Sequence, residues 1–355
     1  MARFSRLFLS LVAVAIAIPA SHAAAYSENF LLIARGTQDT AIGAKVSSSN
    51  SLGRIYTVPS ASNPDVNDSP PWPLPVGATA PQTGNYNDGN IAITHRKGTY
   101  DFSDIDIYAD VGVRCQNGAT GRCREGWSGS SLSGGGTFAD DSILMGQIEA
   151  ELDGFKATIA GLSPTDTWTV SGAGNKSGSG IWKIGSDGVD ENTTITLGTG
   201  QNVIVIDTDG NDAKINNAGL VVNGAAGSSV VFILKDQEQN FLFTDASITY
   251  GMDGIGGDAI VFAMLDGGND SNFDFSKVIV NGAKFWDLSQ DGGQINMDNV
   301  QGCGQWTADH LNFNDVQLAR CKPPSQAIPE PGAATLMAAG FFCIMGAVRR
   351  PSTKR

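Results

Sequence analysis

The sequence has few histidines and cysteines and a shortage of basic residues. Three histidines and five cysteines occur among 355 residues, and 23 Lys and Arg stand against 36 Asp and Glu, a formal net charge of -13. A surface this acidic suits neither nucleic acid nor anionic lipid, both of which select basic patches. We therefore expect no nucleic-acid partner.

Signatures of catalysis are also scarce. The chain contains no G-x-S-x-G sequence and no phosphate-binding glycine loop ending in Lys-Ser or Lys-Thr. After Ala25, histidine occurs only at positions 95 and 310, which argues against a Ser-His-Asp hydrolase and against a zinc finger. Glycoside hydrolysis needs two carboxylates across a cleft, and no pair stands out. We expect a protein without catalytic activity, and the alternative is a solenoid enzyme that acts on polysaccharides.

The N-terminus predicts export. Arg3 and Arg6 precede the apolar segment 7–20, and small residues follow it. This order is typical of a secretory signal peptide, to which we assign residues 1–25, with cleavage expected before Ala24 or Tyr26. A permanent N-terminal anchor is the alternative.

The C-terminus has three parts in a fixed order. Pro329, Glu330 and Pro331 come first, the apolar run 333–348 follows, and Arg349 and Arg350 open a basic tail. The run is shorter than the roughly 20 residues of a stable membrane span. Terminal arginines favour the cytoplasmic side.

This tail, residues 322–355, resembles a PEP-CTERM sorting signal, which exosortases recognise and cleave. The resemblance implies export through the inner membrane and transient membrane passage of 333–348. It further implies processing near Pro329-Glu330-Pro331 and a final place at the cell envelope, the cell surface or outside the cell. The implied partners are an exosortase and the secretion machinery.

The cysteines predict disulfides in an exported chain. Cys343 lies in the tail, and the other four form two local pairs, Cys115 with Cys123 and Cys303 with Cys321. Four cysteines allow three pairings, of which we favour the two local ones.

One amphipathic helix is expected over residues 141–163. Apolar residues recur there at steps of three and four, Asp140 or Asp141 can cap the start, and Ser163-Pro164 can end it. The preceding part, 26–140, is expected to be rich in strands at 29–33, 91–94 and 105–108. A proline-rich insertion interrupts it at 59–81.

After the helix, short β-type runs repeat at a regular interval along the chain. Runs begin at 203, 230 and 259, and a second set ends in glycines at 224, 251 and 282. A period of about 28 residues predicts a mostly β protein with a parallel β-solenoid over 164–321, against which the helix packs. Val205, Phe232 and Phe262 would share one column and the three glycines one corner. A β-sandwich or jelly roll is the alternative.

The layout of residues 29–321 resembles the exported bacterial domains called choice-of-anchor A. An N-terminal NFLLI strand, a central helix and glycine-punctuated β repeats end in VQGCGQWTADHLNFNDVQLARC at 300–321. The proline-rich insertion departs from that layout. The resemblance implies an exported surface domain.

Asp207, Asp209 and Asp212 surround a glycine turn and provide hard oxygen ligands of the kind calcium prefers. The glycine comes fourth and no glutamate follows at the EF-hand position, so ordinary turn chemistry is the alternative. Calcium is the one cofactor to consider. The six tryptophans follow no solenoid period, which favours core packing over a sugar-stacking surface.

These observations together predict a secreted, exosortase-processed structural or adhesion protein of the cell surface or extracellular matrix. A calcium-binding or glycan-binding module is a further alternative, and extracellular polysaccharide is the expected class of ligand.

Overall fold

The computed structural model describes the body of the chain with gaps. The described residues are 26–35, 45–48, 53–55, 89–94, 99–103, 105–109, 111–116, 125–128, 131–133, 135–164, 168–171, 173–234, 239–250, 255, 259–265, 271–289, 293–314 and 316–319. They form 25 strands, one α-helix and one short 3-10 helix. The proline-rich insertion and the sorting tail lie outside them.

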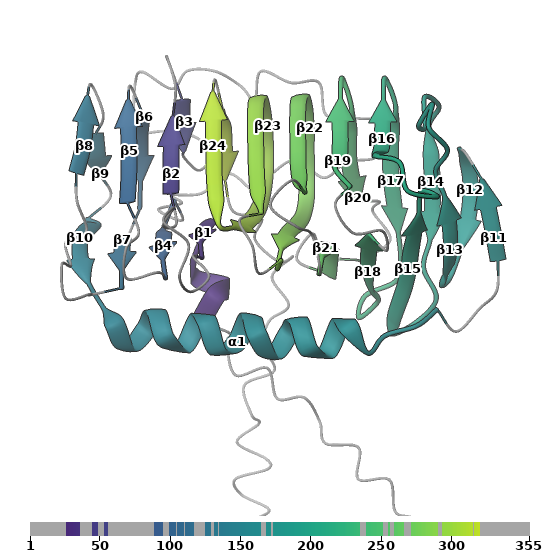
Figure 1. Cartoon of the computed structure of the whole chain (residues 1–355), viewed down its shortest axis with the longest axis horizontal. Helices are drawn as coiled ribbons and strands as arrows, with labels where there is room; N and C mark the ends of the chain where they lie inside the picture. Colours follow the sequence, from purple (N-terminus) through teal and green to yellow (C-terminus); the bar gives the residue numbers. More distant parts are fainter. Residues whose placement is uncertain are drawn as a thin grey trace, which may run out of the picture.

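The strands form a three-sided parallel β-solenoid whose long axis runs across Figure 1. Every pairing between described strands is parallel. Val203 pairs with Val231 in parallel, so the predicted solenoid is confirmed and the jelly roll is not.

Three series of paired strands make the three faces. The helix face comprises β1 (Leu32–Ala34), β4 (Ile91–Ile93), β7 (Gly112–Cys115), β10 (Thr137–Asp140), β11 (Trp168–Ser171), β13 (Gly180–Lys183), β15 (Gln201–Asp207), β18 (Ser229–Leu234), β21 (Ile260–Met264) and the last parts of β22 (Asn272–Asp287) and β23 (Gln294–Ala308). The ladder face comprises β2 (Lys45–Ser48), β5 (Thr99–Ser103), β8 (Glu125–Ser128), β16 (Ala213–Asn216), β19 (Phe241–Thr244), β24 (His310–Asn314) and the first parts of β22 and β23. The third face comprises β3 (Gly53–Ile55), β6 (Ile105–Tyr108), β9 (Ser131–Ser133), β12 (Gly174–Ser177), β14 (Thr193–Thr196), β17 (Gly219–Asn223), β20 (Ser247–Tyr250), β25 (Gln317–Ala319) and the middle parts of β22 and β23.

The order of strands along the axis differs from their order in the chain. On the helix face the stack runs β11, β13, β15, β18, β21, β22, β23, β1, β4, β7, β10. The turns that follow α1 in the chain, from β11 to β23, therefore occupy the first part of the stack. The turns that precede α1, from β1 to β10, continue the stack in the same direction. Residues 26–140, predicted as a β-rich part, complete the same solenoid. The strands predicted at 91–94 and 105–108 correspond to β4 and β6, whereas the strand predicted at 29–33 begins only at Leu32, after a 3-10 helix at Tyr26–Asn29.

The helix α1 (Ser142–Ala160) carries the chain from the β10 end back to the β11 end, along the stack (Figure 1). Asp141 caps it by accepting a hydrogen bond from the Leu144 backbone at 3.0 Å, as predicted. Met145, Ile148 and Leu152 are buried against the helix face, whereas Ile143, one of the apolar residues on which the predicted helix at 141–163 was based, is 78% exposed. No helix among the described residues is long and apolar enough to cross a membrane.

A column of aromatic side chains fills the interior. Phe232 stacks on Phe262 with ring centroids 4.4 Å apart, and Phe262 stacks on Phe285 at 5.2 Å. Each such pair adds about 0.5–1.5 kcal/mol beyond simple burial. The residue level with Phe232 in the preceding turn is Ile204, so the prediction that Val205 shares this column is wrong by one residue.

The turns of the solenoid differ in length, and their corners do not share a glycine. Residues that pair on the helix face are separated in the chain by 28 positions from Val203 to Val231 and by 30 from Val231 to Val261. The next two turns are shorter, with 23 positions from Val261 to Lys284 and 21 from Lys284 to Gln305. On the third face Val222 is level with Tyr250, and Thr249 with Asn281. Gly224 and Gly282 are thus two positions out of step, and the predicted shared glycine corner is wrong.

The corner between the ladder face and the third face uses another device. Asn217, Asp245, Lys277 and Asn299 all have positive φ, between 47° and 55°. Backbone bonds align them, since the amide of Asn217 donates to the Thr244 carbonyl and that of Asp245 to the Ser276 carbonyl. Asn and Asp tolerate this left-handed conformation better than other non-glycine residues. The chain therefore makes the same sharp turn in four successive layers.

Candidate functional site: the closing junction

The closing junction is the place where the first turn of the chain meets the last turn and α1. The 3-10 helix η1 (Tyr26–Asn29) contacts α1, and β1 lies between β23 and β4. The first described residues after the expected signal peptide are therefore held in the middle of the stack.

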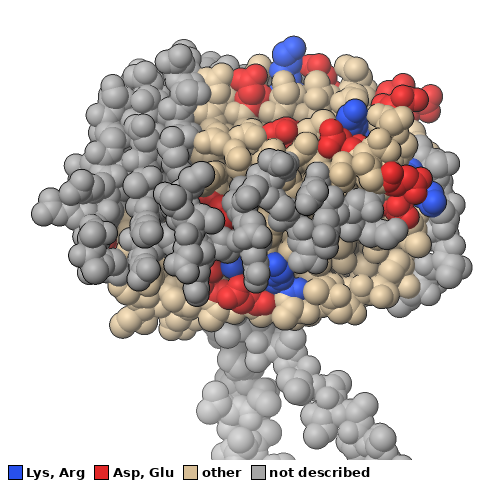
Figure 2. Space-filling model, in the orientation of Figure 1, with Lys and Arg blue, Asp and Glu red and all other residues tan. Residues whose placement is uncertain are grey.

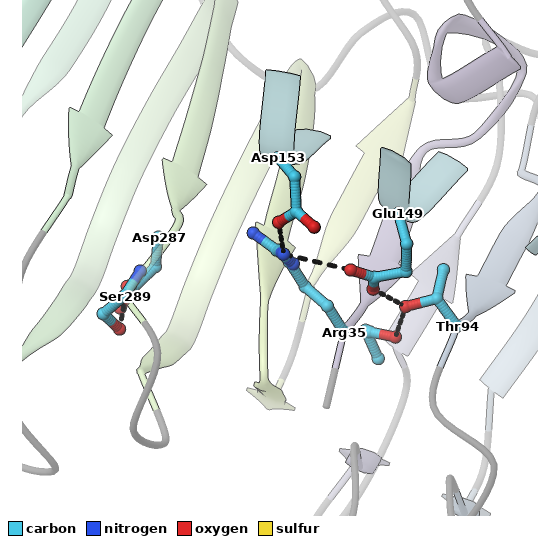
Figure 3. A network of polar contacts seen from close by, with 7 residues as sticks. Arg35, Thr94, Glu149, Asp153, Asp287 and Ser289 are labelled. Carbon is cyan, nitrogen blue, oxygen red and sulfur yellow. Dashed lines mark hydrogen bonds and ion pairs between the residues drawn. The ribbon is translucent and has the colours of Figure 1, made fainter. Parts of the chain in front are cut away.

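Arg35 is the central charge of the junction. It follows β1 and is 4% exposed. Its Nη2 donates to Glu149 Oε2 at 3.0 Å and to Asp153 Oδ1 at 2.8 Å, both on α1. Burial opposes the charge of Arg35, but the Glu149 and Asp153 carboxylates outweigh it and raise the pKa of Arg35. Figure 3 shows the guanidinium between the two helix carboxylates, with Thr94 donating to Glu149.

Gln305 connects the N-terminal segment to the last turn. It is 2% exposed, and its Nε2 donates to the carbonyls of Ser27 at 2.7 Å and Phe30 at 2.9 Å. Its Oε1 accepts from Trp286 Nε1 at 3.0 Å. Three buried polar groups are thus satisfied by one side chain, which is the requirement for placing them in a core.

Two further contacts fix η1 from opposite sides. Ser27 donates from its backbone amide and its hydroxyl to the Glu151 carboxylate of α1, at 3.1 and 2.7 Å. Glu28 forms an ion pair with Lys284 of β22. The N-terminal segment is therefore bound to the helix and to the C-terminal turns at once.

Asp287 is the most perturbed acid of the described residues. It is 1% exposed and takes the position that Met264 has in the preceding turn. Burial raises the pKa of Asp287 to about 7, opposed by two hydrogen bonds from Ser289 and reinforced by the nearby Asp309 carboxylate. Ser289 donates from its hydroxyl at 2.6 Å, and Asp287 Oδ2 has no hydrogen-bond partner among the described residues. Figure 3 shows this pair apart from the Arg35 cluster.

A raised pKa in a carboxylic acid is what general acid catalysis requires. Catalysis also requires contact with substrate, and neither Asp287 nor Asp309 is accessible. Gly293 closes one side, because a Cβ at that position would lie 2.1 Å from Asp287 Oδ2. In this arrangement the junction holds the two halves of the solenoid together.

The aspartates predicted for calcium serve as turn and corner acceptors. Asp207 accepts from the Asp209 amide at 3.4 Å, and Asp212 accepts from the amide and side chain of Asn240 at 3.1 and 3.2 Å. Asn240 in turn accepts from the Asn272 amide at 2.9 Å. Within the described part of the chain no three acidic, histidine or cysteine side chains are grouped as a metal site.

The ladder face carries a second polar array, which was not predicted from the sequence. Asn312 donates to Asn296 at 2.9 Å, and Asn296 donates to Asp274 at 2.6 Å, across three neighbouring strands. Burial raises the pKa of Asp274. The recurrence of Asn and Asp at fixed register positions in β22, β23 and β24 is the signal that could have revealed it.

Cys115 and Cys303 are each disulfide-bonded. Cys115 lies in β7 on the helix face and Cys303 in the middle part of β23 on the third face, and the turns that hold them are three strand spacings apart along the stack, through β4 and β1, or about 14 Å at about 4.8 Å per strand. A disulfide spans at most about 7 Å between Cα atoms, so they are not bonded to each other. Cys123 and Cys321 lie outside the described residues, and the two local pairings stay a prediction.

The remaining predicted site residues also lie partly inside and partly outside the described part of the chain. Trp182, Trp286 and Trp306 are buried, which confirms core packing for these three. Pro329, Glu330, Pro331, Arg349 and Arg350 lie outside the described residues. Charged side chains of both signs are intermixed on the described surface that Figure 2 shows.

No protein-family model and no curated protein matches the chain. An ice-binding protein from the Antarctic ascomycete Antarctomyces psychrotrophicus aligns over 84% of this chain and 96% of its own, with 11% identity and a TM-score of 0.38. The ice-binding protein LeIBP from an Arctic yeast aligns over 84% and 95%, with 12% identity and a TM-score of 0.38. Similarities of this size carry no argument for the function of this chain.

Proposed function

We propose that this protein is a secreted, exosortase-processed structural or adhesion protein of the cell surface or extracellular matrix, without catalytic activity. The observation that carries the proposal is the pairing of β1 with β23 and of β25 with β3. The chain enters and leaves the solenoid at neighbouring turns in its middle. A tail that continues from β25 would hold the rod by its centre and leave both ends accessible, which suits display on a surface.

The structure of the polar groups is consistent with a scaffold. The carboxylic acid with the most raised pKa, Asp287, is sealed in the interior, and the buried charges of α1 connect parts of the fold. Acid–base residues of an enzyme must instead reach a substrate.

The processing part of the proposal is tested by intact-mass measurement of protein from the native host. We expect a species that lacks residues 1–23 or 1–25 and everything beyond the Pro329-Glu330-Pro331 site. A strain without its exosortase should accumulate the longer chain. A mature species that still carries Arg349 and Arg350 would contradict the proposal.

The enzymatic alternative is tested with the mature protein and a panel of polysaccharides. We expect no release of reducing ends. If release occurs, and if it is lost on Asp287→Asn while the variant stays folded, the protein is a polysaccharide-acting enzyme and the scaffold proposal fails.

Glycan binding is a second candidate, favoured by the ladder of Asp274, Asn296 and Asn312. Their side chains are half-buried and repeat at the strand spacing of about 4.8 Å, so amide and carboxylate groups form a regular polar surface. Co-sedimentation with insoluble polysaccharide should show binding by the wild type. Asn296→Leu should weaken the binding, whereas Val221→Leu on the third face should not.

A further inference from the structure

Among the described strands, the two ends of the stack are sheet edges of matching polarity. At one end β11 pairs only with β13, and β12 only with β14, among the described strands. At the other end β8, β9 and β10 pair only with β5, β6 and β7. Because all strands are parallel and both halves wind in one direction, a second copy could add its β10 end to this β11 end and continue the solenoid. Open edges of this kind promote association.

The β10 end is apolar on its inner side. Leu132 of β9 and Phe138 of β10 are partly buried and pack against the interior of the last turn. They continue inward rows that hold Ile107 and Val113 in the turn before. This end would therefore present suitable apolar side chains to a second copy.

The β12 end carries a charge on the inner side instead. Lys176 is the one buried residue of β12, at 5% exposure, while Gly174, Asn175 and Ser177 are exposed. Lys176 is level with Ile195, which is level with Val222, so a lysine takes the inward position that Ile and Val have in the next two turns. Its Nζ lies 5.1 Å from the centre of the Trp182 ring, over the end of the core.

We propose that Lys176 closes this end of the stack to a second copy of the chain. A further turn placed on β11 and β12 would enclose the ammonium group between Trp182 and the added apolar layer. Covering an ammonium group with apolar side chains is unfavourable, because a charge is less stable in apolar surroundings than beside water and polar groups. Inward-pointing charges on edge strands are a known means of preventing edge-to-edge association. Burial already lowers the pKa of Lys176, which means that the present surroundings of the ammonium group disfavour its charge.

The test is the oligomeric state of the full mature chain, measured by sedimentation velocity over a wide concentration range. The wild type should stay monomeric. Lys176→Met should associate with increasing concentration, so that the average mass rises above that of the monomer and approaches or exceeds about twice that value at the highest concentrations. Lys176→Arg keeps the charge and should stay monomeric. Lys183→Met is the matched control, since Lys183 is half-buried on the neighbouring strand β13 and points to the other side.

A second substitution identifies the surface that the associated copy uses. Phe138→Lys in the Lys176→Met background places a charge on the inner side of the β10 end and should restore the monomer. If Lys176→Met stays monomeric, or if the wild type already associates end to end, the proposal is wrong. Should Lys176→Met fail to fold, Lys176→Gln takes its place. Loss of folding in both would assign Lys176 to internal stability and overturn the proposal.

Discussion

Leu32 of β1 lies level with Trp306 of β23 in a parallel pair, although 274 positions separate them in the chain. The first turn of the solenoid therefore docks on the last one, and the stack is complete only when both are present. Contacts of such long sequence separation form late, because the chain entropy of closing the loop is lost before they contribute. Substitutions that weaken the closing junction should therefore lower the free energy of unfolding of the whole stack.

Gln305→Leu should destabilise the protein by about 3 to 5 kcal/mol, because it leaves the Phe30 carbonyl and the Trp286 indole N–H buried without their Gln305 partner. It also removes one of the two hydrogen bonds that the Ser27 carbonyl accepts, the other coming from the Phe30 amide. Urea unfolding of the mature protein measures the change. The control is Gln301→Leu on the same strand, where the side chain is half-buried on the third face and a change within about 0.5 kcal/mol is expected. Equal effects from the two substitutions would remove the role given to Gln305.

Asp287→Asn should stabilise the protein increasingly as the pH rises. In the unfolded chain Asp287 ionises near its ordinary pKa of about 4, whereas in the folded protein the pKa is raised to about 7. Below about pH 4 the group is protonated in both states and has no effect, and between about pH 4 and 7 the folded state loses relative stability as the unfolded carboxyl ionises. The loss reaches at most about 4 kcal/mol.

The measurement is the free energy of unfolding of wild type and Asp287→Asn at about pH 4, 6 and 8. The difference between the two proteins should grow in favour of the variant from the lowest to the highest pH. A difference that stays constant with pH would show that Asp287 is ionised normally in the fold.

Lys277→Asn should stabilise the protein by about 0.5 to 1 kcal/mol. Lys277 has φ of 55° in a corner where the other layers have Asn or Asp, and a lysine in this conformation costs about 1 kcal/mol or more. Its ion pair with Asp245, at 3.9 Å, joins two exposed groups and contributes little. Lys277→Ala removes the ion pair without relieving the backbone, so a gain as large as that of Lys277→Asn would contradict this reasoning. Thermal unfolding compares the two variants.

Gly302→Ala should destabilise the protein by more than about 3 kcal/mol, because a Cβ there would lie 1.8 Å from the Val280 carbonyl oxygen at φ of 127°. Gly146→Ala is the opposite case. This glycine lies within α1 with no atom near its Cβ position, so alanine should add about 0.5 to 1 kcal/mol. Denaturant unfolding of both variants checks the contrast, and a tolerated Gly302→Ala would mean that β22 and β23 can separate locally.

The disulfides should join Cys115 to Cys123 and Cys303 to Cys321. Ala319, two positions before Cys321, is level with Cys303, which favours the second bond. Loops of this length stabilise by roughly 2 to 3 kcal/mol each when unstrained. Non-reducing peptide mapping of the mature protein identifies the bonds. A peptide that links Cys115 to Cys321 would show that the local pairing is wrong.

The sequence determined the class of fold and the helix. Short β runs that recur at a regular interval, with turns between them, are enough to require stacking, because a single short run cannot bury its apolar side alone. The helix was equally readable, since its apolar spacing, its Asp141 cap and Pro164 are all local features. The aspartates at 207, 209 and 212 were less informative, because turns and metal sites use the same residue types.

Tertiary structure decided the phase of the strands and the order of the turns. The runs on the helix face are apolar on both sides, since the interior covers one side and α1 the other, so no alternation shows whether Ile204 or Val205 points inward. The docking of β1 on β23 depends on contacts across almost the whole chain, among them Gln305 with Ser27 and Arg35 with Glu149. Such pairs leave no periodic trace in the sequence, because each is a single match between two distant segments rather than a repeated local preference. The closing junction therefore became visible only in the folded chain.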